Sequence, residues 1–215
     1  HHGVGYQGGE KMEDMILNLF IGIAAPLAMM IFICKGDTRR LLLFLLFGMT
    51  VCYAAGWLNE FTRLALGLEV EIASTGLGPM AEELTKALPV LVYAFLFKPK
   101  RRTLLECSAM VGVGFAILEN AIYFLSGVNL LYALGRGFGS GMMHCVCTIT
   151  VGYGVSFVHV RRKLFYTGTT ALLSAAIIYH SVYNTLVQSS HQLVGFLLPV
   201  LTFIPVLVLL NKTEV

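Results

Sequence analysis

Four separate segments of this sequence place ionisable or amide side chains inside long apolar stretches. They are EELTK at 82–86, FAILEN at 115–120, a lone His144, and HSVYN at 180–184. A charge at the centre of a membrane helix costs roughly 2.5–3.5 kcal/mol on insertion scales, so packing alone seldom requires it. Such residues usually face a cavity inside the helix bundle and take part in chemistry or transport. The functional site is therefore expected among these residues.

These side-chain types suit the hydrolysis of a peptide bond, which needs an activated water, an oxyanion stabiliser and a proton donor. Glutamates activate water, while histidine and asparagine donate hydrogen bonds to an oxyanion. A serine mechanism finds little support, because no GxSxG signature occurs and these serines lie outside the four segments: Ser108, Ser126, Ser140, Ser156 and Ser174. Neither HExxH nor a Cys-His signature is present.

Lys86 is expected to pair with a carboxylate of its own helix. Glu82 precedes it by four residues and Glu83 by three, so either can be the partner. Since one partner is enough, the other glutamate is free to act as a base or as a ligand, and the spacing does not say which. The simpler alternative is a buried ion pair that only orients the helix.

A metal site is one reading of the remaining residues. One Glu and two His form a known catalytic zinc set that leaves a fourth position open for water. Glu119, His144 and His180 are the hypothetical ligands, with Glu82 or Glu83 as the general base. Water activation by glutamate alone is the other reading, and both stay open.

The amides complete the candidate catalytic set. His180 and Asn184 share one helix face, so they can contact one ligand together. Asn184, with Asn120, is expected to polarise the scissile carbonyl, while the histidines and Glu119 relay protons if no metal is bound. Taken singly, Glu119 and His144 also fit simpler structural roles, as a protonated interhelical donor and a core histidine.

The elements that must position these residues are membrane helices. Of the 215 residues, 57% are hydrophobic and 13% are charged, against about 25% charged in soluble domains. The pattern predicts an all-α, polytopic bundle with seven spans at 15–34, 41–59, 79–97, 104–125, 132–158, 166–187 and 193–210. Residues 1–11 resemble a tag remnant and tail, and 12–215 form one membrane domain with its motif-bearing core at 75–190.

Loop charges predict the orientation of the bundle. Loops 35–40, 98–103 and 159–165 carry clusters of Lys and Arg, whereas 60–78 and 188–192 are poor in them. The positive-inside rule then places the N-terminus outside and the C-terminus in the cytoplasm. All four polar segments fall roughly 5–15 Å below the outer surface at 1.5 Å per residue, which predicts one shared site. Because the basic residues sit in these short loops, nucleic acid is not an expected partner.

Glycines predict close helix packing in two places. Gly137 and Gly141 form a small-xxx-small pair that allows a neighbouring helix to approach closely. Gly112 and Gly114 in the preceding span are interpreted in the same way.

The ordered set of motifs resembles the PrsW family of intramembrane proteases, relatives of the CAAX prenyl proteases and of the APH-1 subunit of γ-secretase. The resemblance rests on EExxK at 82–86, FxxxEN at 115–120, His144 and HxxxN at 180–184, and it covers about 75–190. The CAAX branch has EExxxR and a histidine closing its FxxxH motif. Lys86 and Glu119 occupy the comparable places here, which favours the PrsW branch.

The resemblance implies cleavage of a single-span anti-sigma factor near its extracytoplasmic side, as the first step of a stress response in a bacterial plasma membrane. Our sequence-based prediction is accordingly an intramembrane endopeptidase, with zinc or no cofactor. A proton-coupled transporter is the first rival, because buried Glu and His also serve proton relays. An APH-1-like scaffold without catalysis, and a CAAX-type protease acting on the cytoplasmic side, are the others.

Overall fold

The computed structural model describes Ile16 and residues 35–127 and 129–212, and this part of the chain forms helices and no strand, as predicted. Its elements, in chain order, are α2 (Gly36–Leu66), α3 (Val70–Ile72), a short π-helix η1 (Ala73–Leu77), α4 (Gly78–Phe97), α5 (Arg101–Phe124), α6 (Leu130–Val155), α7 (Arg162–Val187) and α8 (Gln192–Lys212). The predicted span 15–34 and the predicted tail 1–11 lie outside the described residues, apart from Ile16.

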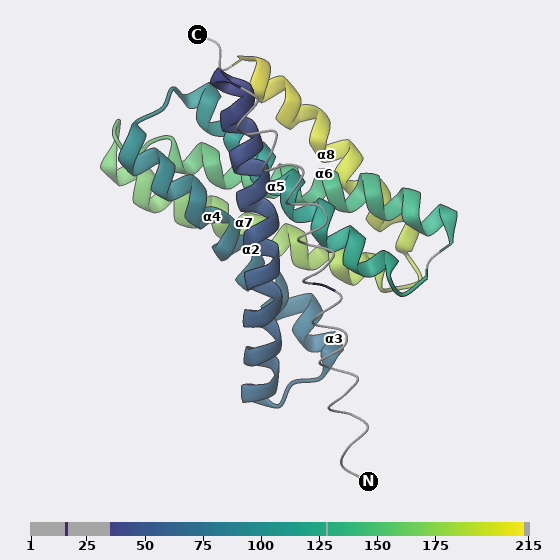
Figure 1. Cartoon of the computed structure of the whole chain (residues 1–215). Helices are drawn as coiled ribbons and strands as arrows, with labels where there is room; N and C mark the ends of the chain where they lie inside the picture. Colours follow the sequence, from purple (N-terminus) through teal and green to yellow (C-terminus); the bar gives the residue numbers. More distant parts are fainter. Residues whose placement is uncertain (1–15, 17–34, 128, 213–215) are drawn as a thin grey trace.

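The other six predicted spans all coincide with helices (Figure 1). Four of these helices are long and apolar enough to cross a membrane: α2, α5, α7 and α8. The remaining two, α4 and α6, carry part of the predicted site, with Glu82, Glu83 and Lys86 on α4 and His144 on α6. The chain is therefore a helical membrane protein, while the count of seven spans and the orientation of its ends stay predictions.

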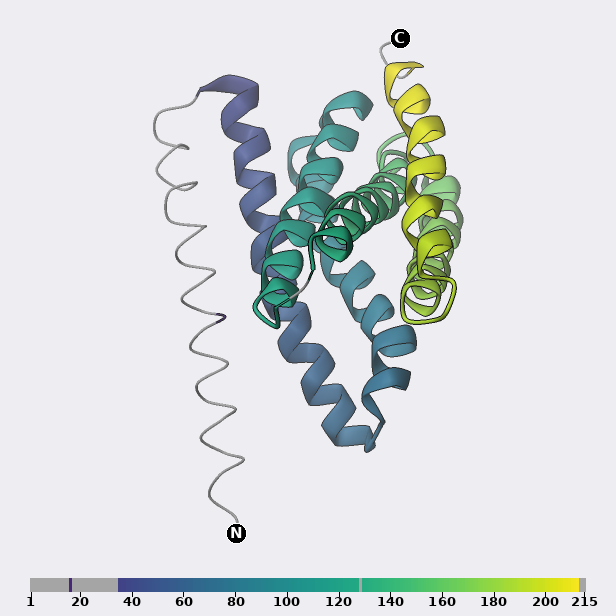
Figure 2. The ribbon, with the colours of Figure 1, turned by 90° about the vertical axis from the view of Figure 1, so that its right-hand side faces the viewer.

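The predicted loop 60–78 is wrong, because the chain there is mostly helical. α2 continues to Leu66, where Gly67 takes the left-handed conformation (φ +63°) and ends the helix with its N–H on the Arg63 and Leu64 carbonyls. After a short turn, α3 and η1 lead directly into α4. The end of α2 and α3 form a hairpin that projects from the rest of the bundle (Figures 1 and 2).

Close approach of helices occurs at some of the predicted glycines and not at others. Gly48 of α2 lies against the backbone of α5 at Val111, and Gly114 of α5 against that of α2 at Leu45. Gly112 packs on the backbone of His144 in α6, so the prediction for the 112–114 pair is confirmed. Gly137 and Gly141 do not pack in this way within the described part of the chain, because nothing in it lies within 4 Å of a Cβ added at either position. In α6 it is the alternate pair, Gly135 and Gly139, that packs against Phe196 of α8.

Gly112→Ala is expected to move the site, because an added Cβ would lie 2.6 Å from the carbonyl oxygen of His144. Such overpacking costs about 1–3 kcal/mol of stability. Gly141→Ala is the matched control, since nothing lies within 4 Å of its added Cβ and alanine favours the helix by roughly 1 kcal/mol. Thermal unfolding in detergent should show a lower Tm for the first variant and an equal or higher Tm for the second. Equal behaviour of the two would contradict this packing.

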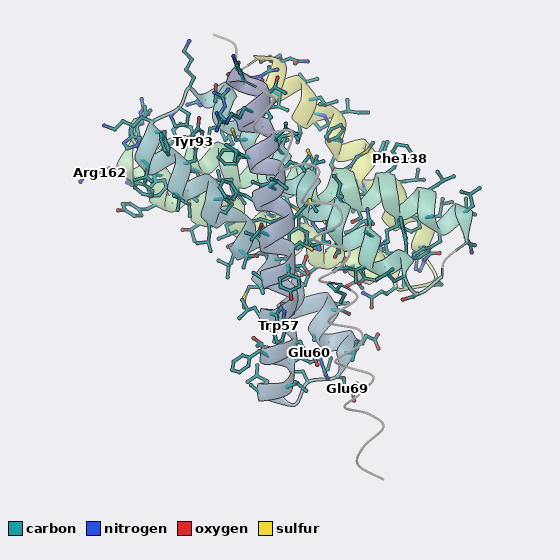
Figure 3. The ribbon with its side chains drawn as sticks, in the orientation of Figure 1. Trp57, Glu60, Glu69, Tyr93, Phe138 and Arg162 are labelled. Atoms are coloured by element: carbon teal, nitrogen blue, oxygen red, sulfur yellow. The ribbon has the colours of Figure 1, made fainter. Side chains whose placement is uncertain are left out.

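Helix ends from distant parts of the sequence meet at the basic end of the bundle. The Nε of Arg101, at the start of α5, donates to the Oγ of Ser156 after α6 at 3.1 Å, and Arg102 donates to the Leu210 carbonyl of α8 at 2.6 Å. His159 contacts the Ala94 carbonyl of α4 at 2.9 Å. Two of the basic loops, 98–103 and 159–165, are thereby brought to one end. Figure 3 shows Arg162 far from Glu60 and Glu69, which lie on the projecting hairpin.

Candidate active site

Helix α4 starts the site with a buried ion pair. Lys86 Nζ lies 2.5 Å from Glu83 Oε1, one turn apart, and neither side chain reaches solvent. The same Glu83 oxygen lies 2.8 Å from Nδ1 of His180 in α7, and Lys86 Nζ lies 2.9 Å from Nδ1 of His144 in α6. The pair therefore connects three helices rather than only orienting its own.

These contacts assign the proton positions of both histidines. An ammonium only donates, so Nδ1 of His144 accepts from Lys86 and its proton sits on Nε2. A carboxylate only accepts, so Nδ1 of His180 carries its proton toward Glu83 and Nε2 is left with a lone pair. Glu83 and Lys86 thus fix the two rings in opposite tautomers.

Glu119 of α5 is the second charged centre. Its Oε2 accepts from three side chains of α6: Arg136 at 2.9 Å, His144 Nε2 at 3.0 Å and Ser140 at 3.2 Å. The guanidinium of Arg136 also lies 3.4 Å from the centre of the Tyr123 ring, and it is buried. The antiparallel contact of α5 with α6 therefore joins Glu119 to His144, as the order of the motifs predicted.

Glu82 is the carboxylate without a strong partner. Its Oε1 is 3.5 Å from Asn59 Nδ2 in α2, at the limit of a hydrogen bond. Its Oε2 is buried and makes no hydrogen bond within the described part of the chain. The nearest polar atom recorded for Oε2 is Nε2 of His180, at 3.7 Å. A carboxylate oxygen and a ring lone pair thus face one another across a gap too long for a hydrogen bond.

Donor types and spacing around this gap fit a metal ion. One ligand atom each from Glu82, His144 and His180 lies within 4.8 Å of the others. Two ligands of one tetrahedral zinc ion lie roughly 3.4 Å apart at zinc–ligand distances of about 2.0–2.1 Å, close to the 3.7 Å observed. His144 becomes the third ligand when its ring gives up one of its two present partners. The structure thus groups Glu82, in place of the hypothetical ligand Glu119, with the two histidines.

The balance of charges in the site also favours a cation beside Glu82. Three carboxylates, Glu82, Glu83 and Glu119, face two cations, Lys86 and Arg136, and both histidines are neutral in the assigned tautomers. One negative charge is left over in a largely buried cluster, and burying an unpaired charge is strongly unfavourable. Because Glu82 alone lacks a cation, the position beside its Oε2 favours a proton or a metal ion.

An open cavity of about 280 Å³ leads to the two less buried glutamates, Glu82 and Glu119. Its walls come from α2, α3, η1, α4, α5 and α7, and include Asn59, Tyr123 and Asn184. The projecting hairpin supplies Glu60 and Arg63 at the rim, where they form a bidentate ion pair of 2.7 and 2.8 Å. Glu83 and Lys86 do not line the cavity, which separates their environment from that of Glu82.

The π-helix η1 forms the part of the cavity wall just before α4. Short π-helical segments are common at functional sites, where they interrupt the regular ladder of carbonyls. The Ser74 carbonyl in this π-helix accepts a hydrogen bond from Nδ2 of Asn184 at 3.0 Å. The amide of Asn184 has a second N–H, which remains for a group in the cavity. Asn120 is buried, and its Oδ1 makes no hydrogen bond among the described residues.

Six of the eight predicted catalytic residues thus form one network: Glu82, Glu83, Lys86, Glu119, His144 and His180. The four polar segments do not include Ser140, Asn59 or Arg136. The position of Arg136 near the outer end of a predicted span is compatible with a carboxylate, an anionic substrate group or a lipid headgroup as its partner, and in the structure the partner is the carboxylate of Glu119. Ser140 lies one turn before His144 and Arg136 two turns before it, so the helical periodicity from His144 was the signal that identifies both.

Comparison with known proteins assigns the chain to a family. No curated protein and no solved structure matches the chain. The model of one family does match, over residues 37–210, and it describes the PrsW family of intramembrane metalloproteases. This match covers α2 to α8 almost entirely and includes every residue of the network. The chain therefore belongs to the PrsW family and is an intramembrane protease.

Proposed function

We propose that this protease cleaves a single-span membrane protein at the cavity formed by Glu82 and Glu119. The observation that carries the proposal is the position of Glu82, which lines an open cavity while its buried Oε2 makes no hydrogen bond among the described residues and lies 3.7 Å from Nε2 of His180. A water or a metal ion placed between them lies next to any peptide that enters. Among buried groups, such an oxygen is expected where a reacting molecule completes the site.

Glu82, His144 and His180 would hold a divalent ion, with zinc the best match to these donors. When bound, the ion would supply Lewis-acid polarisation of the carbonyl and a more nucleophilic water. Glu82 orients the attacking water and accepts its proton, whether or not the ion is present. Glu83 and Lys86 act as positioning residues, because they set the tautomers of both histidines.

Glu119 takes part in proton transfer to the leaving amine, and the two amides stabilise the oxyanion. The water oxygen adds to the carbonyl carbon, the C–N bond breaks, and the proton taken from the water by Glu82 passes by way of Glu119 to the leaving amine. Asn184, with the second N–H of its amide, donates to the developing oxyanion, and Asn120 supports it from α5. Donors preorganised in this way typically contribute about 10²–10³-fold to the rate.

The substrate is proposed to be an anti-sigma factor in a bacterial plasma membrane, cut near its extracytoplasmic side. At 1.5 Å per residue, α2 rises about 28 Å from Arg40 to Asn59, close to the thickness of a hydrocarbon core. Asn59 is the residue that reaches Glu82, so the site lies about one membrane thickness from the basic end. A substrate helix must unwind there, because its carbonyls are otherwise hydrogen-bonded.

A single-span reporter with an anti-sigma-like membrane segment, co-reconstituted in proteoliposomes, tests this proposal. We expect cleavage near the end of the span that leaves the membrane on the side opposite the basic loops. Zinc at about one per chain, and loss of cleavage with a chelator that zinc restores, support the metal-dependent form. Cleavage that persists in metal-free protein would instead assign water activation to Glu82 alone. Absence of cleavage across several such reporters would contradict the proposed substrate.

A further inference from the structure

The buried arginine of α6 is not explained by packing. Arg136 is 5% exposed, and an arginine inside a membrane helix is costly unless it has a specific partner. Contacts of α6 with α8 on this turn are made by Gly135 and Gly139 against Phe196, so they do not need the guanidinium. Its contacts are instead with two residues that line the active-site cavity, Glu119 and Tyr123.

These two residues hold the guanidinium from two sides. Glu119 and Tyr123 are one turn apart on α5, so both reach the same point of α6. The Tyr123 ring lies under the guanidinium at 3.4 Å, and one terminal nitrogen lies 2.9 Å from Glu119 Oε2. Arg136 is therefore fixed in both position and plane, which a lysine at this place would not be.

Arg136 and Ser140 together fix the orientation of the Glu119 carboxylate. Arg136 and Ser140 both hold Oε2 independently of His144. Glu119 therefore keeps its orientation when the His144 ring changes partner, as binding of a metal ion requires. The other oxygen, Oε1, is left for groups that enter the cavity.

We infer that Arg136 is a positioning residue for hydrolysis, acting through Glu119. It holds Glu119 so that Oε2 supports the His144 ring and Oε1 serves the reacting peptide. This inference rests on the proposed function for its kinetic consequence, and on the ion pair alone for its effect on His144.

Steady-state cleavage by Arg136→Gln, Arg136→Lys, Glu119→Gln and the double Gln variant tests the inference. Arg136→Gln should lower kcat by about 10- to 100-fold, the usual loss for an outer partner of a catalytic ligand, with KM within about twofold. Arg136→Lys should recover part of kcat. In the Glu119→Gln background, removal of Arg136 should change kcat by less than about twofold, because residues that act as a unit are not additive. Arg40→Gln, which breaks an exposed pair with Asp37, should leave both constants unchanged.

Rates are normalised to the folded fraction from size-exclusion chromatography. If Arg136→Gln does not fold, Arg136→Lys decides by the same split of kcat and KM, since it keeps the charge but loses the planar contact with Tyr123. Equal losses from Arg136→Gln with and without Glu119, or a change in Tm or KM alone, would overturn the inference.

A second readout does not depend on activity. In chelator-treated protein labelled with ¹⁵N-histidine, the ring nitrogens of His144 report its tautomer, with a His144→Gln spectrum for assignment. The wild type should show the proton on Nε2, hydrogen-bonded to Glu119, and Arg136→Gln should keep this tautomer, because Lys86 still donates to Nδ1, but should shift the Nε2 resonance as Glu119 loses its fixed orientation. An unchanged spectrum would overturn the inference even if no reporter is cleaved. Cleavage by the wild type together with a fully active Arg136→Gln would overturn it while leaving the proposed function intact.

Discussion

Glu82→Gln should abolish cleavage while the protein stays folded. A general base contributes about 10²–10⁴-fold to a hydrolysis, and the amide neither accepts the proton of water nor holds a metal ion well. We therefore expect kcat to fall about 10³-fold or more. Stability should change little, because Glu82 Oε2 has no hydrogen bond to lose among the described residues and Oε1 has only the 3.5 Å contact with Asn59.

The readout is cleavage of the reporter together with thermal unfolding in the same detergent. Glu106→Gln is the control, since Glu106 is a partly exposed helical glutamate that pairs with Arg102 at the opposite end of the bundle. It should cleave at the wild-type rate. A Glu82→Gln protein with normal Tm and normal kcat would remove Glu82 from the mechanism and leave Glu119 as the only glutamate of the network that lines the cavity.

Lys86→Met should produce the largest loss of stability of any single change in the site. It leaves Glu83 fully buried with only His180 as a partner, and removing one member of a buried ion pair costs about 3–5 kcal/mol. His144 loses the donor on its Nδ1 at the same time. Cleavage should fall with stability, because the tautomers of both histidines are no longer fixed.

A second substitution that restores the charge balance should separate the loss of stability from the loss of cleavage. In Lys86→Met with Glu83→Gln, one carboxylate and one cation are removed together, so the net charge of the site stays as in the wild type, and the Gln carbonyl still accepts from His180 Nδ1. We expect this double variant to regain most of the lost free energy of unfolding, measured by denaturant in mixed micelles, but to recover little activity. Lys163→Met, at an exposed position, serves as the control and should be neutral. A Lys86→Met protein as stable as this control would show that the pair is not the structural centre described here.

The projecting hairpin shows one limit of the sequence. The sequence predicts that the span ends near 59, or continues through Asn59 and Glu60 with 61–78 as an interfacial segment. α2 continues because Glu60 and Arg63 pair one turn apart on the helix surface, and a helix that leaves the hydrocarbon is free to carry charges. Polarity alone therefore marks where the apolar environment ends, and not where the helix ends.

The glycines of α6 show another limit. Gly135, Gly137, Gly139 and Gly141 are equivalent in sequence, yet only the first and third meet α8. Which face of a helix touches a neighbour depends on how the helix is rotated in the bundle. The small-residue pattern does not contain that rotation when glycines occur on adjacent faces.

The sequence by itself determined the class of the protein, six of its helices, the four polar segments and their membership in one site. These follow from apolar length, from the high cost of charges in a membrane, and from helical spacing, all of which are local. Tertiary structure alone decided the roles within the site. Glu83 and Glu82 are neighbours with equal chemistry, and only the approach of His180 and His144 from other helices commits Glu83 to Lys86 and leaves Glu82 facing the cavity. The contacts of Arg136 and Ser140 with Glu119 likewise depend on how α5 and α6 cross. Residue spacing along one helix does not predict a partner on another helix.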